Sequence, residues 1–374
     1  MFRSRWTMPA ILILLHVYVG VTLIPYLPLN GFGRLLAGLL LALSCYLVPL
    51  GFRSRSLEKP WLAWAGLLAM GIFSSLAVLS VVRGVVIAVL MLFPDNLSDA
   101  VIERSAEAVI GLVLLFTVLG VFNARRIAKV VEVELPVENL PAALEGFTIV
   151  QISDIHVGPT IHRPYIAGIV GRVNSLEADV VAVTGDLVDG SVRQLAEHIQ
   201  PLAGLKGRYG VYVVTGNHEY YSGALEWVEH LKTMGLRVLL NEHVVISHND
   251  AELVLAGITD YSAGMFVPQH KSDPHAAIRG APDSVPRILL AHQPRSAKLA
   301  AEAGFDVQLS GHTHGGQFWP WMHFVRFQQP WVAGIHRLGK LCVYISRGTG
   351  YWGPPIRFGA PSEITRIRLI ASHR

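Results

Sequence analysis

Long apolar runs dominate the first third of the chain. Four precede residue 125, at residues 8–29, 35–52, 61–82 and 106–123, and the third keeps its apolar character as far as Phe93. A helix needs roughly 20 residues to cross the hydrocarbon core of a bilayer. A cleaved signal peptide accounts for one such run but not for four. The pattern therefore predicts four transmembrane helices in a membrane domain of residues 1–128.

After Val130 the pattern changes to short β-branched and aliphatic runs that alternate with amphipathic stretches, which is typical of strands interleaved with helices. Strands are predicted at residues 147–152, 180–184, 211–215, 253–258, 287–291, 307–309, 341–346 and 364–370. Helices are predicted at residues 164–176, 191–199, 223–234 and 295–303. Residues 129–145, which mix charge with Pro136 and Pro141, are expected to be a linker. Residues 146–374 are then a soluble α/β domain.

Composition and charge agree with this division. The chain is 52% hydrophobic and 16% charged, which is too apolar for an ordinary soluble enzyme. With only Cys45 and Cys342, neither a disulfide framework nor a cysteine metal site is expected. Cations gather before the first run (Arg3, Arg5), between the second and third (Arg53, Arg55, Lys59) and after the fourth (Arg125, Arg126, Lys129). The positive-inside rule therefore predicts that the amino terminus and the α/β domain are cytoplasmic.

Two polar residues interrupt the apolar runs. Arg83 stands near the end of the third run, where snorkelling to the membrane interface is the favoured interpretation and a functional charge inside the membrane is the alternative. His16 lies inside the first run and is expected to be a packed or hydrogen-bonded residue rather than a ligand.

Five polar clusters follow predicted strands directly. They are Asp154 with His156; Gly185, Asp186 and Asp189; Gly216, Asn217, His218 and Glu219; His292; and Gly311, His312, Thr313 and His314. Open α/β sheets bind ligands at the carboxyl ends of their strands, so the five clusters should converge on one place. The sequence thus predicts a single site built from all of them.

The side chains of these clusters are those that bind divalent metal ions. Asp154, His156, Asp186, Asn217, His292, His312 and His314 are seven candidate ligands, more than one ion with an open position would use. Carboxylates, imidazoles and an amide suit Mn²⁺, Fe²⁺ or Zn²⁺. Two such ions with two ionised carboxylates leave a charge of about +2, which suits hydroxide plus a phosphodiester or pyrophosphate. A two-metal hydrolytic site is therefore predicted.

The five clusters resemble, in type and order, the motifs of the calcineurin-like metallophosphoesterase superfamily over roughly residues 146–374. In sequence order they are Asp-x-His, Gly-Asp-x-x-Asp, Gly-Asn-His-Glu, a lone strand-end His and Gly-His-x-His. The resemblance implies a β-sandwich of two mixed sheets flanked by helices, here preceded by an all-α membrane domain. The run Gly311 to Gln317, the turn Ser346-Arg347-Gly348 and the multi-span amino terminus further resemble a membrane-associated branch. Some of its relatives are similar to UDP-2,3-diacylglucosamine pyrophosphatases, which implies a protein of the bacterial inner membrane.

The resemblance also implies roles for individual residues. One metal ion would be held by Asp154, His156, Asp186 and His314, and the other by Asp186, Asn217, His292 and His312, so that Asp186 bridges the two, with Mn²⁺ favoured. A hydroxide bridging the metals would attack phosphorus, while His218 donates a hydrogen bond or a proton to the leaving oxygen. Asp189 and Glu219 would orient the ligands, with a plain surface or capping role as the alternative. Arg347, Arg295 and His162 are candidates to bind the substrate phosphate, with ordinary solvation as the alternative.

Residues 318–331 hold six aromatic residues, Phe318, Trp319, Trp321, Phe324, Phe327 and Trp331. They predict either a lipid-facing lip beside the site or a loop that folds back into the core. A lip together with an anchor favours a lipid-linked substrate, and no nucleic-acid polymer is expected as a partner. The alternatives are an anchored phosphatase or nucleotide phosphodiesterase with soluble substrates, a non-enzymatic membrane sensor or scaffold, and a transporter, against which the lack of a polar pathway in the apolar runs speaks.

Overall fold

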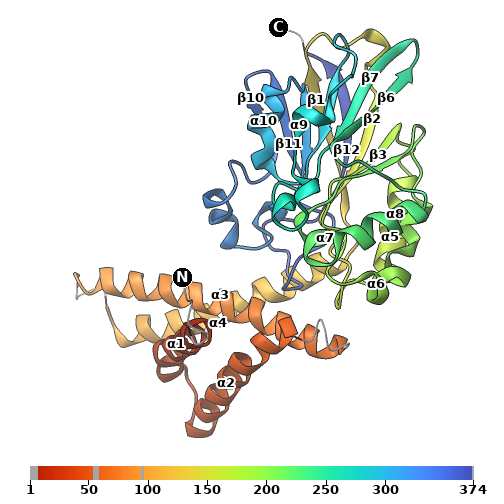
Figure 1. Cartoon of the computed structure of the whole chain (residues 1–374). Helices are drawn as coiled ribbons and strands as arrows, with labels where there is room; N and C mark the ends of the chain where they lie inside the picture. The colour runs from red at the N-terminus through yellow and green to blue at the C-terminus, as the bar shows by residue number, and fades with distance from the viewer. Residues whose placement is uncertain (1–6, 54–58, 94–96, 373–374) are drawn as a thin grey trace. The chain divides into compact units, whose positions relative to one another are not determined.

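The computed structural model describes residues 7–53, 59–93 and 97–372, and it divides the chain into two compact units (Figure 1). The helical unit comprises Met1–Asn123 and Gly353–Phe358, and the α/β unit comprises Ala124–Trp352 and Gly359–Arg374. The predicted fold class is confirmed: two mixed sheets with flanking helices follow four apolar helices.

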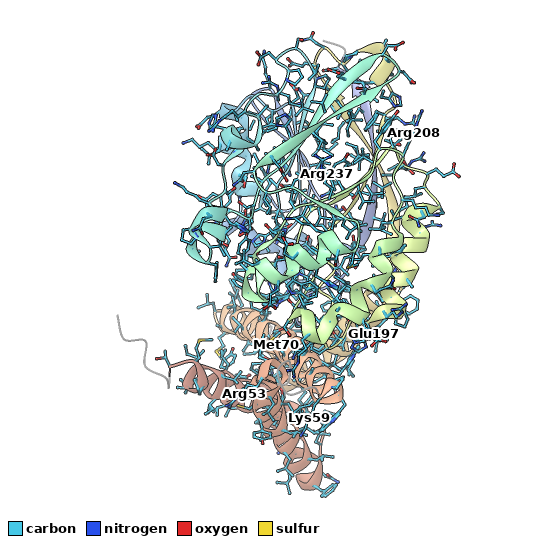
Figure 2. The ribbon with its side chains drawn as sticks, turned by 45° about the vertical axis from the view of Figure 1, so that its right-hand side comes forward. Arg53, Lys59, Met70, Glu197, Arg208 and Arg237 are labelled. Atoms are coloured by element: carbon cyan, nitrogen blue, oxygen red, sulfur yellow. The ribbon has the colours of Figure 1, made fainter. Side chains whose placement is uncertain are left out.

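The helical unit contains four long helices, α1 (Thr7–Leu23), α2 (Gly31–Arg53), α3 (Pro60–Leu90) and α4 (Asp99–Arg125). Each is long and apolar enough to cross a membrane, with a mean hydropathy of 2.1 to 2.3 in its most apolar window. Helix α4 begins earlier than the fourth apolar run because an acidic residue, Asp99, suits the first turn of a helix. Figure 2 labels Arg53 at the end of α2 and Lys59 just before α3. Arg3, Arg5 and Arg55, on which the predicted orientation also rests, lie outside the described residues.

Helices α2 and α3 approach each other closely at two glycines. A Cβ atom added to Gly66 would lie 2.5 Å from Cα of Gly51, so only residues without a side chain fit at this crossing. His16 of α1 reaches both of the same helices, since its Nε2 lies 3.3 Å from Oγ of Ser44 and its ring stacks on Phe73. His16 is thus a packed and hydrogen-bonded residue, in agreement with the sequence-based interpretation.

Arg83 differs from its favoured interpretation, because its side chain is buried inside the helical unit rather than extended to an interface. It donates hydrogen bonds to the carbonyl oxygens of Thr22 (2.7 Å) and Ile102 (2.9 Å) and to Oγ of Ser105 (2.9 Å). The guanidinium carbon also lies 5.1 Å from the ring centroid of Tyr26. These partners come from three separate parts of the unit, so Arg83 links the helices.

A short segment from late in the chain, Gly353–Phe358, belongs to the helical unit. Ile356 fills the space left by Gly71 of α3 and Gly120 of α4, where an added Cβ would lie 2.5 Å and 2.4 Å from its side chain. The amide of Arg357 donates to the carbonyl of Gly120 at 2.9 Å, and Phe358 stacks on Phe116. The helical unit therefore contains a short segment that lies far outside the predicted domain of residues 1–128 in the sequence.

Two six-stranded sheets form the centre of the α/β unit (Figure 1). The first has the order β1-β12-β2-β3-β4-β5, with β1 (Lys129–Val137), β12 (Glu363–Ala371), β2 (Thr148–Ile152), β3 (Val180–Val183), β4 (Val211–Val213) and β5 (Arg237–Val238). The second has the order β10-β11-β9-β8-β7-β6, with β10 (Gly334–Leu338), β11 (Leu341–Ile345), β9 (Val307–Ser310), β8 (Arg287–Leu290), β7 (Ala251–Gly257) and β6 (Glu242–His248). Strands β2 to β5 run parallel, as do β7, β8, β9 and β11.

Apolar side chains of both sheets meet in one buried layer between them, and the helices cover the outer faces. Residues such as Ile149, Val180, Leu255 and Leu290 form the layer between the sheets. Helices α5 (Arg163–Asn174), α6 (Val192–Ile199) and α8 (Ala224–Thr233) pack on the first sheet, and α9 (Pro274–Ala277) and α10 (Ala297–Glu302) pack on the second. Burial on both faces explains why the central strands appear in the sequence as continuous apolar runs.

The expected linker of residues 129–145 is corrected by the structure, because Lys129–Val137 forms β1 and pairs in parallel with β12. Leu135 and Val137 are the buried residues of β1, and the other positions of the strand are more exposed. Pro136 is tolerated because β1 is an edge strand. Strands β5, β6 and β10 were also missed. They are short or lie at or near sheet edges, where polar residues interrupt the apolar run.

Candidate metal centre

The five polar clusters come together at the carboxyl ends of β2, β3 and β4 in one sheet and of β8 and β9 in the other. The predicted metal ligands form two groups, Asp154 with His156 and His314, and Asp186 with His292 and His312, and His156 forms a third group with Asp189 and His218. Within each group the potential ligand atoms all lie within 4.8 Å of one another. All residues of the first two groups except His312 are buried. The predicted convergence of the clusters is therefore present in the fold.

In the first group, two imidazole rings direct their Nε2 atoms toward each other. Nε2 of His156 lies 3.0 Å from Nε2 of His314, which in turn lies 3.5 Å from Oδ1 of Asp154. Asp186 reaches this group as well, since its Oδ2 is 3.7 Å from Nε2 of His156. Two ring nitrogens at hydrogen-bond distance need a proton or a cation between them, so this donor set fits a metal ion.

In the second group, Asp186 uses the same oxygen. Oδ2 of Asp186 lies 3.1 Å from Nε2 of His292, which is also 3.1 Å from Nδ1 of His312 and 3.2 Å from Oδ1 of Asn217. Four donors thus surround a second point, and one carboxylate oxygen is shared with the first group. The donor set again fits a divalent ion bound by nitrogen and oxygen ligands.

The backbone is strained where it carries these side chains. Asp154, His156, Asp186, His312 and His314 all have φ between 52° and 70°, in the left-handed region. Asp and His are among the side chains that occur there more often than most, and such residues cluster at functional sites. Glycine is required beside them, because a Cβ on Gly216 would lie 2.2 Å from Oδ1 of Asp186 and one on Gly311 would lie 2.2 Å from Oδ2 of Asp154.

Hydrogen bonds fix which ring nitrogen of His292 and of His156 faces the centre. Nδ1 of His292 lies 2.8 Å from the carbonyl of Thr184, which can only accept, so Nδ1 carries a proton and Nε2 faces the centre. Nδ1 of His156 is held in the same way at 3.2 Å from Oδ1 of Asp189. When these rings are neutral, the lone pairs of their Nε2 atoms are therefore directed at the centre.

Glu219 organises the loops rather than facing the centre. Its buried carboxylate accepts hydrogen bonds from the backbone amides of Asp186 (3.0 Å), Leu187 (2.7 Å) and Gly216 (2.6 Å). These amides belong to the loops after β3 and β4, so Glu219 holds the two loops together. Burial raises the pKa of this carboxyl, and the neighbouring Asp186 raises it further.

His218 stands beside these two groups of predicted ligands and forms the third group with His156 and Asp189. Its ring lies at a hydrogen-bond distance of 2.5 Å from Oδ1 of Asp189 through Nδ1, and its Nε2 is 4.0 Å from Oδ2 of Asp186. Burial disfavours its charged form, but Asp186 and Asp189 raise its pKa to about 9. A protonated imidazole with one nitrogen anchored and the other directed to the centre suits proton donation.

Burial and mutual charge interactions shift the pKa values of the carboxylates and imidazoles in the centre. Burial raises the pKa of Asp154, whereas for Asp186 the pKa is held well below its usual value because His292 and His218 outweigh the cost of burial. In return, the pKa of His292 is raised well above its usual value. Burial and the adjacent His292 lower the pKa of His312 to about 3.

The three candidate phosphate-binding residues occupy different places. Arg347 follows β11, its stem lies against the turn at Gly315, and its Nη1 donates to the buried carboxylate of Glu363 at 2.9 Å. Arg295 donates to the carbonyl of Gln328 and lies over the ring of Tyr261. His162 stacks on His198 beside the start of α5. Arg347 is thus next to His314, while His162 belongs to another cluster.

The aromatic segment of residues 318–331 is divided between the two predicted environments. Phe318 is buried, and Trp331 packs against the second sheet's outer core and stacks on His336. Trp321, Phe324 and Phe327 are exposed, the last by 79%. One half of the segment therefore belongs to the core, and the other half presents apolar rings to the surroundings.

Two residues near the centre were not singled out from the sequence. The ring centroid of Trp352 lies 5.7 Å from that of His218, and the ring centroid of Tyr221 lies 5.2 Å from it. Tyr221 is the second residue after the Gly-Asn-His-Glu motif and was detectable by that proximity. Trp352 carries no such signal, since it is far from His218 in the chain.

Comparison with known proteins decides the family. The family model for calcineurin-like phosphoesterases matches residues 147–316, the part of the chain that carries all five clusters. A transmembrane protein with metallophosphoesterase domain from Danio rerio is 38% identical over 325 residues, which cover 83% of this chain and 74% of the relative. The chain belongs to the calcineurin-like metallophosphoesterase family. Its members are phosphoester hydrolases that generally use two divalent metal ions.

Two further relatives give the same result. The protein of the same description from Bos taurus is 40% identical over 280 residues, and the match spans 72% of this chain and 63% of that protein. An uncharacterized metallophosphoesterase from Aquifex aeolicus is 33% identical over 245 residues, which cover 64% of this chain and 91% of the relative. The similarity to the vertebrate proteins extends beyond the phosphoesterase domain into the apolar helices.

Proposed function

We propose that this protein is a membrane-anchored phosphoesterase that uses two divalent metal ions to hydrolyse a phosphodiester or pyrophosphate bond. The observation that carries the proposal is the sharing of Asp186. Its Oδ2 lies 3.7 Å from Nε2 of His156 in one group of ligands and 3.1 Å from Nε2 of His292 in the other. A carboxylate shared in this way is what a pair of closely spaced metal ions requires.

In the proposed centre, Asp154, His156 and His314 would hold one ion, Asn217, His292 and His312 would hold the other, and Asp186 would be shared between them. Mn²⁺ is the favoured ion, because the set combines carboxylate and amide oxygens with imidazole nitrogens and contains no thiolate. When bound, the two ions would activate water and stabilise negative charge on the phosphoryl oxygens.

The residues of this chain would then orient and protonate the reacting groups. Water supplies the oxygen that forms the new bond to phosphorus and loses one proton to the solvent, and the bond from phosphorus to the leaving oxygen breaks. His218 donates its Nε2 proton to that leaving oxygen, because Asp189 holds Nδ1 and keeps the ring charged. Arg347, whose guanidinium forms an ion pair with Glu363, would contact a phosphoryl oxygen.

We further propose that the phosphoester is lipid-linked, a class exemplified by UDP-2,3-diacylglucosamine. The four apolar helices would anchor the chain in the bacterial inner membrane with the phosphoesterase unit on the cytoplasmic side. The exposed rings of Trp321, Phe324 and Phe327 support this substrate class, because aromatic side chains favour the interface between water and lipid.

The test uses the full chain, purified in detergent and loaded with Mn²⁺. We expect it to hydrolyse bis(p-nitrophenyl) phosphate, and to release the nucleoside monophosphate from a diacylated UDP-sugar faster than from an unacylated one. Asp186→Asn should abolish both activities and reduce the bound metal. Asp283→Asn is the matched control, since Asp283 is a fully exposed carboxylate that pairs with Arg287.

Two results would contradict the proposal. If Mn²⁺-loaded protein hydrolysed no phosphoester at all, the enzymatic assignment would fail. If Asp186→Asn retained full activity, the shared-ligand arrangement would be wrong even though the protein is an enzyme. Equal rates on acylated and unacylated substrates would leave the hydrolase intact and remove the lipid-linked class.

A further inference from the structure

Three aromatic side chains form a continuous surface beside His218. The ring centroid of Tyr221 lies 5.2 Å from that of His218, and the centroid of Trp352 lies 5.7 Å from it. Phe266 continues the surface from Tyr221, at 5.4 Å between centroids. We call Tyr221, Phe266 and Trp352 the aromatic wall. It joins the end of α7 (Asn217–Tyr221) to two loops that are distant from it in the chain.

The wall is not part of the hydrophobic core. Tyr221 is 60% exposed, Phe266 47% and Trp352 38%, although each ring carries enough apolar area to be a core residue. Apolar side chains that gather at the surface of a soluble unit, rather than standing singly, mark binding surfaces. The wall therefore has the exposure expected of a surface that is covered when a ligand binds.

The wall is also held firmly in place. The side chain of Gln317 forms two hydrogen bonds with the backbone of Trp352. The amide of Trp352 donates to Oε1 of Gln317 at 2.8 Å, and Nε2 of Gln317 donates to the carbonyl of Trp352 at 2.9 Å. Next to Tyr221, the buried Tyr220 bonds through its hydroxyl to Nδ1 of His270, in the loop that carries Phe266. A surface fixed in this way loses little conformational entropy on binding.

The position of the wall relates it to one part of the substrate. His218 is the residue proposed to donate a proton to the leaving oxygen, so the group attached to that oxygen leaves the centre past His218. Besides His156 in the centre, the rings of Tyr221 and Trp352 contact His218. The wall therefore lies where the leaving group must be, and not beside the phosphoryl group that stays in the centre.

The shape and chemistry of the wall indicate which kind of leaving group it fits. Adjacent rings are inclined by 72°, 63° and 64° along the series that joins Trp352, His218, Tyr221 and Phe266. A planar base needs a parallel ring face, whereas a flexible alkyl chain adapts to a faceted surface. Met265, adjacent to Phe266 and 79% exposed, adds another flexible apolar side chain.

We propose that the aromatic wall binds an alkyl chain on the leaving group, and that it thereby selects phosphodiesters and pyrophosphates whose leaving group is amphiphilic. Gln317 acts as a positioning residue, because it holds Trp352 without lying in the wall. The inference rests on the proposed phosphoesterase function and names the residues that set its substrate preference.

The test compares two chromogenic diesters that differ only in the leaving group. One is methyl p-nitrophenyl phosphate, and the other is the same diester with an octyl chain on the nitrophenyl ring, so that the leaving phenols have similar acidity. The Mn²⁺-loaded full chain is assayed in detergent with both esters, below the concentration at which the octyl ester aggregates. The variants are Phe266→Ala, Trp352→Ala, Trp352→Phe and, as the control, Ile335→Ala. Ile335 is 47% exposed like Phe266 but lies on β10.

We expect unsubstituted protein to prefer the octyl ester in kcat/KM. Phe266→Ala and Trp352→Ala should each lower kcat/KM for the octyl ester about tenfold more than for the short ester, the effect of losing one large apolar contact. Trp352→Phe should restore most of the preference, Gln317→Ala should lower it with a similar bias toward the octyl ester, and Ile335→Ala should leave it unchanged.

Equal losses on both esters would overturn the inference, because the wall would then only support His218. A missing preference for the octyl ester in unsubstituted protein, or a loss of preference in Ile335→Ala as large as in Phe266→Ala, would overturn it as well. These failures are distinguishable from failure of the proposed function, in which neither ester is hydrolysed by any variant.

Discussion

Replacing Asp189 by asparagine tests the proton-donor role of His218 most directly. Oδ1 of Asp189 accepts from Nδ1 of His218 at 2.5 Å and from Nδ1 of His156 at 3.2 Å, and the carboxylate is almost fully buried. Asparagine keeps an oxygen acceptor at the same place, so both rings can retain their orientation, but the negative charge is lost. The variant therefore separates charge from geometry.

The expected loss follows from the charge-assisted hydrogen bond. Such a bond contributes about 1.5–3 kcal/mol, which corresponds to a factor of roughly 10 to 150 in rate if it acts in the transition state. Despite the cost of burial, Asp186 and Asp189 raise the pKa of His218 to about 9. Without the charge on Asp189 this pKa falls, and less of the imidazole is protonated at neutral pH.

The assay is kcat/KM for a series of aryl phosphodiesters that span good and poor leaving phenols. A poor leaving group needs the proton more, so the loss in Asp189→Asn should grow as the phenol becomes less acidic. Metal content must be measured in parallel, because the contact with His156 also orients a proposed ligand, and weaker orientation reduces metal affinity by about 10- to 100-fold.

Equal losses across the series, with full metal content, would refute the proton-donor reasoning for His218. A loss that disappears at saturating Mn²⁺ would show instead that Asp189 acts through His156. Asp283→Asn, at an exposed carboxylate, provides the control for removing one negative charge from the protein and should follow the unsubstituted enzyme throughout.

Three further outcomes are expected. Arg83→Met should destabilise the helical unit by about 3 kcal/mol or more, seen as a lower unfolding temperature in detergent, because three buried hydrogen bonds are lost; an unchanged temperature would contradict the linking role. Gly66→Leu should destabilise it too, whereas Gly38→Leu on α2, with nothing within 4 Å, should not. Metal affinity of the apoprotein, measured by calorimetry, should rise with pH beyond neutrality and release protons on binding, because the raised pKa of His292 means that a proton must leave before metal binds. Affinity that is independent of pH would refute this.

The convergence of the five clusters was predictable because its signals are local. Each cluster, such as Asp154 with His156 or His312 with His314, follows a buried strand at once, and parallel strands present their carboxyl ends at the same edge. The apolar runs predict the strands, and the parallel strands predict that the clusters converge. The assignment of the ligands to two metal ions came from family resemblance and stays a prediction.

The remaining differences arise from long-range pairing, which leaves no local signal. Lys129–Val137 alternates weakly and contains a proline, so its status as a strand depends on β12, more than 200 positions later. The segment Gly353–Phe358 fits only because glycines of α3 and α4 leave room for Ile356. For Arg83 the sequence showed a charge near a helix end, but not the two carbonyls and the hydroxyl that surround it.

The aromatic wall illustrates why substrate preference is harder to predict than chemistry. Metal ligands must be particular residue types, so they stand out wherever they occur. A tyrosine at a helix end and a phenylalanine and a tryptophan in two loops are ordinary residues until the fold places them together. The crowded aromatic segment at residues 318–331 drew attention instead, although part of it is core. What identifies the wall is contact with His218, because a ring beside a proton donor must also lie beside the group that departs with the proton.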